Sequence, residues 1–283
     1  MKYFKYFLQF ISVIFLLLIF RLIGLKFSKK LSGSLFKMIG PIFRSNRVCN
    51  QNLDLAYPNL NDFEKKNILK NMWYNYGCIF AEYVFIKKFN KSENLIIENQ
   101  HILENIKSNS ERVIFVSGHF NNFELMAMHI VKSGIDLAAI YRPLNNIFLN
   151  PLMERIRKKY ICKKQIKKGV SGTKDLLKLF KDGTSIALMI DQRVSQGIKC
   201  NFFEKKAFTT TIPAQFVKKF NSRIVPLYIE RLKGDNFKLK VFEPIKFQEN
   251  ENLEEITLKL NKILEDMIKK NPDQWIWTHN RWK

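Results

Sequence analysis

Apolar residues follow three different patterns along the chain. Residues 6–25 form an almost unbroken apolar stretch, in which only Gln9, Ser12 and Arg21 are strongly polar. From residue 27 to about 107, apolar side chains recur at helical spacing and predict helices at 28–39, 47–55 and 62–85. From Arg112 onward, short apolar runs bounded by turn residues alternate with amphipathic stretches. The patterns therefore change twice, near residues 26 and 110.

The third pattern is typical of strands that alternate with helices. The predicted strands are 113–116, 137–140, 185–190, 224–229 and 237–242, and the predicted helices are 123–131, 151–159, 173–180, 213–220 and 253–269. Such alternation favours a mostly parallel or mixed sheet flanked by helices. We predict an α/β fold with an N-terminal membrane-anchor helix at 1–26 and one domain at 27–283. That domain would consist of a helical lead-in at 27–110 and an α/β core at 111–283.

The first apolar stretch has the length of a membrane span. Its 20 residues would form a helix of about 30 Å, the thickness of the hydrocarbon core of a bilayer. Arg21 lies near the end, where its side chain can reach the headgroups. Lys2 and Lys5 precede the stretch, as in a signal peptide, but no small-x-small cleavage site follows it. An uncleaved anchor is favoured, and a removed signal and a buried core helix remain alternatives.

The cations on the two sides of the stretch predict its orientation. Only the amino terminus, Lys2 and Lys5 precede it, whereas a larger group follows it: Lys26, Lys29, Lys30, Lys37, Arg44 and Arg47. Because the more positive side stays inside the cell, the main domain is expected to face the cytoplasm.

The composition adds a strong positive charge. The 283 residues are 46% apolar, which excludes a disordered basic tail, and the formal net charge is 48 − 25 = +23. Such an excess favours an anionic partner such as nucleic acid, anionic lipid or an acidic protein, although a Lys- and Asn-rich composition accounts for part of it. No zinc-finger spacing, basic zipper or RNP-like motif is present, so nucleic acid is disfavoured. A membrane surface explains the charge more economically.

The four cysteines are far apart in the sequence. Cys49, Cys78, Cys162 and Cys200 form no C-x-x-C pair, which argues against a disulfide scaffold and against a metal cluster. Isolated, reduced thiols suit a domain that faces the cytosol.

The candidate chemistry begins where the first strong strand ends. Gly118 allows an abrupt turn, so His119 is expected on the loop at the carboxyl end of the strand, where sites gather in such sheets. Glu124 falls in the first turn of the following helix. If the chain folds back, the carboxylate can bind one imidazole nitrogen, and the other nitrogen can take a proton from a hydroxyl group. The alternative is a loop histidine bonded to backbone with a helix-capping glutamate.

The remaining histidines offer little. His101, His129 and His279 have no comparable setting, and His129 is expected to serve packing. The spacing of His119 and Glu124 lacks the HExxH geometry and a third ligand, so no metal site is predicted.

Several motifs, in order, carry a family resemblance. The segment GHFNNFE at 118–124 resembles the GHFGNWE motif of the lipid A biosynthesis acyltransferases, within the lysophospholipid-acyltransferase-like superfamily. Further matches follow the family order: NLDLAYP at 52–58, YRPLNN at 141–146, the strand ending in Asp191-Gln192, FFEKKAFTT at 202–210, IVP at 224–226 and WIWTHNRWK at 275–283. The resemblance covers nearly the whole chain.

The resemblance implies a membrane-bound O-acyltransferase of the bacterial inner membrane. Such an enzyme moves a fatty acyl chain from acyl carrier protein, or from acyl-CoA, to a hydroxyl of a lipid A precursor, and needs no cofactor or metal. By carry-over, His119 is the general base and Glu124 its orienting partner. Arg142 would bind phosphate or steady the oxyanion, and its alternative is an ion pair with Asp191. The other implied substrate-binding residues are Asp191, Gln192, Asn122 and Arg193.

Three positions depart from the family pattern. Asn121 stands where the family commonly has Gly, Phe123 where it has Trp, and Glu204 where the FFG sequence supplies Gly. Glu204 adds charge near an expected substrate loop, so an acyltransferase of the same fold with a phospholipid, ornithine-lipid or other glycolipid acceptor remains an alternative. A membrane-bound binding protein without catalysis is the third reading.

Overall fold

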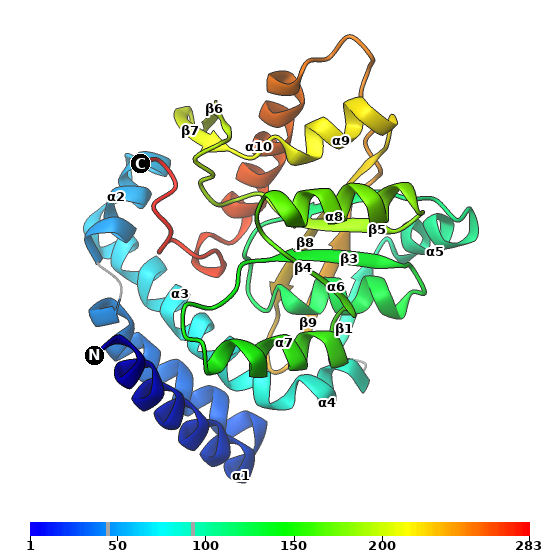
Figure 1. Ribbon diagram of the computed structural model, residues 1–283. Helices are drawn as coiled ribbons and strands as arrows, with labels where there is room; N and C mark the ends of the chain where they lie inside the picture. The colour runs from blue at the N-terminus through cyan, green and yellow to red at the C-terminus, as the bar shows by residue number, and fades with distance from the viewer. Residues whose placement is uncertain (44–45, 92–93) are drawn as a thin grey trace.

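The structure, a computed structural model, describes residues 1–43, 46–91 and 94–283. Arg44, one of the cations counted after the apolar stretch, lies outside the described residues. An apolar helical segment at the N-terminus leads through long helices into a sheet with helices on both faces (Figure 1). This arrangement confirms the predicted fold class.

Seven strands form the central sheet, in the order β1-β9-β8-β2-β5-β3-β4. All neighbours pair in parallel except β8 and β9, which are antiparallel. The sheet is therefore mixed at one side. The strands are β1 Leu95–Glu98, β2 Ile114–Ser117, β3 Leu137–Tyr141, β4 Lys164–Lys167, β5 Ser185–Met189, β8 Ile224–Arg231 and β9 Phe237–Val241.

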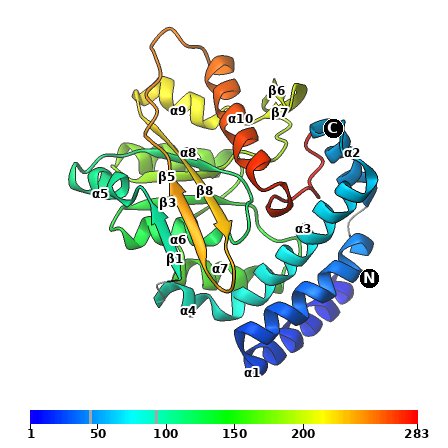
Figure 2. The ribbon, with the colours of Figure 1, turned by 180° about the vertical axis from the view of Figure 1, so that it is seen from behind.

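Helices cover both faces of this sheet. In Figures 1 and 2, α4, α6 and α7 lie on one face, and α8, α9 and α10 lie on the other. A two-stranded hairpin of β6 and β7 packs against α10. These elements are α4 Ile86–Lys91, α5 Gln100–Ser108, α6 Glu124–Lys132, α7 Leu149–Tyr160, α8 Val170–Lys181, α9 Ile212–Phe220, α10 Leu253–Lys270, β6 Ile198–Phe202 and β7 Lys205–Thr209.

The expected helical lead-in contains more than helices. It holds α2 Asn46–Ala56, α3 Asp62–Glu82 and the 3₁₀ turn η1 Tyr83–Phe85 at the predicted places, followed by α4. However, β1 also falls within 27–110 and pairs with β9 at the edge of the sheet. The lead-in therefore contributes one strand to the sheet.

The N-terminal helix α1 (Lys2–Phe43) is broken at Gly24. Its φ of 77° and ψ of 167° lie outside the helical region, a conformation that glycine adopts without steric cost. The two arms fold back on each other and lie side by side (Figures 1 and 2). By length and composition alone α1 could cross a membrane. Its break at Gly24 lies close to the predicted end of the anchor at residue 26, and its second arm contains the predicted helix at 28–39. The sequence did not predict that the two arms form a hairpin.

The second arm of α1 packs closely against α3. A side chain at Gly77 would meet the backbone of Ser32 and Gly33, with the Ser32 carbonyl oxygen only 2.4 Å from an added Cβ. The Ser32 hydroxyl donates a hydrogen bond of 2.7 Å to the Gly77 carbonyl. Further along, Lys29 and Arg231 both contact the fully buried carboxylate of Glu82. These contacts fix the hairpin to the sheet.

Candidate active site

The loop that follows β2 holds the predicted base. Ser117, the last residue of β2, donates a hydrogen bond of 2.6 Å to the Leu227 carbonyl and fixes the strand end. Asn121 has a φ of 40°, a left-handed conformation that asparagine tolerates better than most residues. Its backbone N–H donates to the Gln274 carbonyl at 3.0 Å. The loop between β2 and α6 is thereby held against the C-terminal segment.

His119 on this loop is bonded to Asp191, not to Glu124. The Nδ1 atom of His119 lies 2.8 Å from Oδ1 of Asp191, and its backbone N–H donates to Oδ2 at 2.8 Å. The indole N–H of Trp275 donates to Oδ2 at 2.9 Å. Asp191 follows β5, the parallel neighbour of β2, so the two strand ends place the carboxylate beside the imidazole.

The two groups shift each other's pKa. Burial disfavours the imidazolium of His119, but the charge and hydrogen bond of Asp191 outweigh it and raise the pKa of His119 above 6.5. Burial alone would raise the pKa of Asp191, yet its contacts with His119 and Trp275 lower it to about 2. A carboxylate in this place holds the imidazole in one orientation and stabilises its protonated form.

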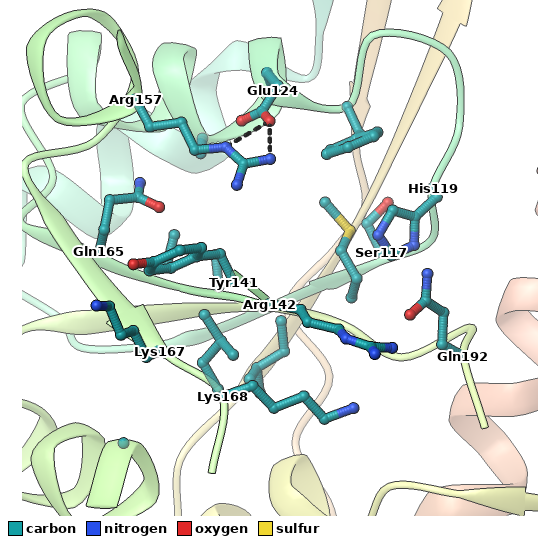
Figure 3. A pocket seen from close by; sticks show the side chains of 18 of the residues that line it. Ser117, His119, Glu124, Tyr141, Arg142, Arg157, Gln165, Lys167, Lys168 and Gln192 are labelled. Atoms are coloured by element: carbon teal, nitrogen blue, oxygen red, sulfur yellow. Dashed lines mark hydrogen bonds and ion pairs between the residues drawn. The ribbon is translucent and has the colours of Figure 1, made fainter. Parts of the chain in front are cut away.

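Glu124 belongs to a separate buried cluster, which overturns its expected pairing with His119. The guanidinium of Arg157 donates to Oε1 of Glu124 from Nε at 2.8 Å and from Nη2 at 2.5 Å, and the Tyr83 hydroxyl donates to the same oxygen. Figure 3 shows Glu124 turned toward Arg157 and away from His119. Because Glu124 opens α6, its side chain points toward α7 and η1, where Arg157 compensates its buried charge.

A cavity of about 420 Å³ opens beside His119. Its walls are mainly apolar, with residues such as Val116, Met126, Ile140, Leu188 and Ile212 from strands and helices around the carboxyl ends of β2, β3 and β5. Cations line it as well, namely Arg142, Arg157, Lys167 and Lys168 (Figure 3). The cavity thus combines space for a hydrocarbon chain with contacts for an anionic group.

The structure separates the other predicted site residues. Arg142 and Gln192 line the cavity, whereas Arg193 lines an adjoining basic pocket and donates to the Lys283 carbonyl at 2.7 Å. Asn122 is only 1% exposed and donates to Glu82 at 3.0 Å. The amide of Asn122 thus serves the buried cluster around Glu82, and Asn122 is not among the residues that line the cavity.

The alternative expectation for Arg142, an ion pair with Asp191, does not match the structure. Asp191 is bonded to His119 and Trp275, so an ion pair between Arg142 and Asp191 does not form. Over the described part of the chain, the exposed guanidinium of Arg142 makes no hydrogen bond or ion pair. Burial lowers the pKa of Lys168, and the nearby charge of Arg142 lowers it further.

Three residues at the site were missed as functional candidates. Arg157 was part of a basic run in the sequence, and its burial against Glu124 has no local signal. Trp275 and His279 lie in the C-terminal motif, 275 − 191 = 84 and 279 − 191 = 88 residues after Asp191 along the chain. Only the folded chain brings Trp275 to Asp191 and His279 to the cavity.

Comparison with known proteins gives the family. A model of the family described as bacterial lipid A biosynthesis acyltransferase matches residues 1–283, the whole chain. The chain belongs to this family. The resemblance stated from the motifs is thereby confirmed, and with it acyl transfer to lipid as the activity class.

Two lipid A acyltransferases of known sequence are similar to this chain and agree with that assignment. It is 25% identical over 264 residues to a lipid A biosynthesis acyltransferase of Haemophilus influenzae, covering 89% of this chain and 81% of the relative. It is 22% identical over 257 residues to the lipid A biosynthesis lauroyltransferase of Escherichia coli K12, covering 85% and 79%. A solved 1-acyl-sn-glycerophosphate acyltransferase, PlsC of Thermotoga maritima, aligns with a TM-score of 0.41 at 13% identity, over 89% of this chain and all of that one.

Proposed function

We propose that this lipid A acyltransferase moves a fatty acyl chain from acyl carrier protein to a hydroxyl of a lipid A precursor. His119 is the general base, and Asp191 orients it. The observation that carries the proposal is the placement of the imidazole, with Nδ1 on a buried carboxylate and the ring at the wall of an apolar cavity. Glu124, the partner expected from the motif, would act through Arg157 on the shape of that cavity.

The reaction needs one proton acceptor. Nε2 of His119 takes the proton of the acceptor hydroxyl, and the oxygen attacks the thioester carbonyl carbon. The carbonyl electron pair moves onto its oxygen and gives a tetrahedral intermediate. Collapse of this intermediate expels the thiolate, which takes the proton back from the imidazolium. Asp191 stabilises the imidazolium while it exists, since its carboxylate lies 2.8 Å from Nδ1.

The lining of the cavity supports these substrates. An acyl chain would lie among the apolar side chains, because each buried methylene contributes about 0.8 kcal/mol. Arg142, Lys167 and Lys168 at the cavity would hold the phosphate of the acceptor by charge-assisted hydrogen bonds. The net charge of +23 would also attract an acidic carrier protein and anionic lipid.

The hairpin of α1 would place the enzyme on the cytoplasmic face of the inner membrane. Large apolar side chains are exposed along both arms, among them Phe4, Phe15, Leu22 and Phe27, each at least 65% exposed. Exposed apolar area of this kind is typical of a membrane contact.

Acyl transfer by purified, detergent-solubilised protein tests the proposal. Acyl carrier protein loaded with mixed fatty acids, or acyl-CoA, is offered with tetra-acylated lipid A precursor and, separately, with lysophospholipid, and products are read by mass. We expect a mass gain on the lipid A precursor with the carrier-protein donor. His119→Ala should lower it by about a hundredfold or more, while His101→Ala, at an exposed histidine, should not.

Other outcomes contradict defined parts of the proposal. Acylation of the lysophospholipid alone would keep the base and overturn the acceptor. Transfer from acyl-CoA alone would overturn the donor. Full activity of His119→Ala would overturn the mechanism.

A further inference from the structure

A second histidine, His279, stands at the wall of the catalytic cavity. It lines this cavity together with His119 and also lines the adjoining basic pocket of about 450 Å³. The other side chains of the basic pocket include Arg142, Lys168, Arg193 and Lys283. His279 therefore lies at the boundary between the cavity beside His119 and the basic pocket, whose cations suit an anionic group.

A long hydrogen bond indicates which nitrogen carries the proton. The backbone N–H of Arg193 donates to Nδ1 of His279 at 3.5 Å, which favours the neutral tautomer with its proton on Nε2. Among the described residues, Nε2 has no hydrogen-bond partner. The ring thus offers one unused N–H donor.

The surroundings keep this ring neutral. Burial and the nearby cations Lys168 and Arg281, together with His119, oppose a charge on His279, and Asp191 opposes them only in part. The pKa of His279 is lowered to about 4 as a result. A neutral imidazole stays a donor across the pH range in which His119 works as a base.

The C-terminal segment holds His279 rigidly. The amide of Asn52 donates to the carbonyls of Trp277 and His279, at 2.7 Å each. The buried guanidinium of Arg281 donates to the Phe208 carbonyl at 2.6 Å and to the Thr209 hydroxyl at 2.7 Å. A donor that is fixed before substrate binds needs no rearrangement in the reaction, which makes it effective against developing charge.

We propose that His279 is a further catalytic residue, whose Nε2–H donates to the thioester carbonyl oxygen as that oxygen becomes negative. The inference rests on the proposed acyl transfer and assigns the group that stabilises its tetrahedral intermediate. The bond forms between the acceptor oxygen and the carbonyl carbon while the carbonyl electron pair moves to the oxygen held by His279. The donor keeps its proton throughout, and the thiolate leaves with the proton from His119.

Two substitutions at His279 separate donation from packing. Leucine fills similar space without a donor, whereas the side-chain N–H₂ of glutamine can reach the place of Nε2. With loaded acyl carrier protein and the lipid A precursor, His279→Leu should lower kcat by about 10²–10³-fold with little change in KM. His279→Gln should stay within about tenfold of the parent enzyme, and the acid limb of the pH profile should not move in either.

Hydrolysis of the acyl thioester by water gives a readout that does not depend on the acceptor. It should fall in His279→Leu in parallel with transfer, because both reactions form an oxyanion on the same carbonyl. A rise in KM for the acceptor with unchanged kcat would overturn the inference in favour of phosphate binding. Equal losses in both variants with a lowered melting temperature would overturn it in favour of packing.

The two proposals fail in distinguishable ways. If His119→Ala is inactive and His279→Leu is fully active, the base stands and only the role of His279 is wrong. If His119→Ala keeps full activity, the mechanism on which the inference rests is wrong.

Discussion

At the scale of single residues, the chemistry depends on how two opposing effects act on His119. Burial favours the neutral imidazole, which can accept a proton. Asp191 favours the imidazolium, which is the ring after it has accepted the proton. The carboxylate prevails, since its own pKa is held at about 2 and it stays ionised at every working pH. The imidazole is therefore a stronger base than free histidine.

The pH dependence of the reaction follows from this balance. Because the pKa of His119 is raised above 6.5, kcat/KM should rise with pH along an acid limb centred above that value. Asp191→Asn removes the charge that raises the pKa, so the limb should move to lower pH and kcat should fall by about 10²–10⁴-fold. The charge of Glu124 contributes less to the raised pKa of His119, so Glu124→Gln should move the acid limb by less than Asp191→Asn does. Profiles measured from pH 5 to 9 that coincide for Asp191→Asn and the parent enzyme would contradict this assignment.

Glu204 carries a backbone conformation better suited to glycine. Phe203 and Glu204 join β6 to β7 with φ values of 50° and 59°, as in a two-residue hairpin turn that favours glycine or asparagine. The left-handed region costs a residue other than glycine about 1–2 kcal/mol. Glycine at this position would relieve that strain, but the greater conformational entropy of glycine in the unfolded chain offsets part of the stabilisation.

We therefore expect Glu204→Gly to raise the free energy of unfolding by about 0.5–1 kcal/mol. Urea unfolding in detergent measures it, and Glu204→Ala serves as the control, because alanine removes the charge and keeps the strain. An equal gain in both variants would assign the effect to charge.

At the scale of elements, close contact between α1 and α3 holds the hairpin in place. A methyl group at Gly77 would collide with the backbone of α1, which cannot move as a flexible side chain would. Gly77→Ala should lower the free energy of unfolding by about 1–3 kcal/mol, as read from thermal or urea unfolding. Asn67→Ala, on the exposed face of the same helix, should be neutral or slightly stabilising. Equal effects of the two substitutions would show that α1 adjusts to the added methyl group.

The same elements show what the sequence pattern predicts and what it misses. All five predicted strands are present. Four of them are mainly apolar and largely buried, and the fifth, β9 with the sequence FKLKV, alternates buried apolar residues with lysines. The strands that were missed include β4 at a sheet edge, whose sequence KQIK has no apolar alternation strong enough to be noticed. Charged residues are typical of edge strands.

The sequence identified several residues that lie at the site, but it did not identify which of their side chains contact one another. His119 and Asp191 were both named, but their contact joins positions 72 residues apart and depends on β2 and β5 being neighbours. Sequence spacing favoured Glu124, since it is close along the chain. Glu124 is paired with Arg157 instead, and nothing in a run of basic residues distinguishes the one that is partly buried against a carboxylate.

At the scale of the whole molecule, the α1 hairpin, with its exposed apolar side chains, packs against the segment of chain that borders the cavity. The amide of Asn146 donates to the Tyr6 carbonyl at 2.8 Å, and the ring of Phe148 contacts Phe7 and Phe10. These contacts lie on the segment that follows Arg142. A lipid substrate that enters from the membrane would therefore meet the hairpin before it reaches the cations of the cavity.

Membrane binding by the exposed face of the hairpin can be tested without removing it. Phe15 and Leu22 are 65% and 86% exposed, so aspartate at both should leave the fold intact. Burial of each side chain in lipid contributes about 1.5–3 kcal/mol, and the new charges are repelled by anionic headgroups. The double variant should lose about a hundredfold or more in partitioning to vesicles that contain anionic lipid, measured by co-sedimentation. Ile96→Asp, at an exposed apolar position on the edge strand β1, should bind as the parent does. Equal losses in both variants would mean that net charge, and not the hairpin, determines binding.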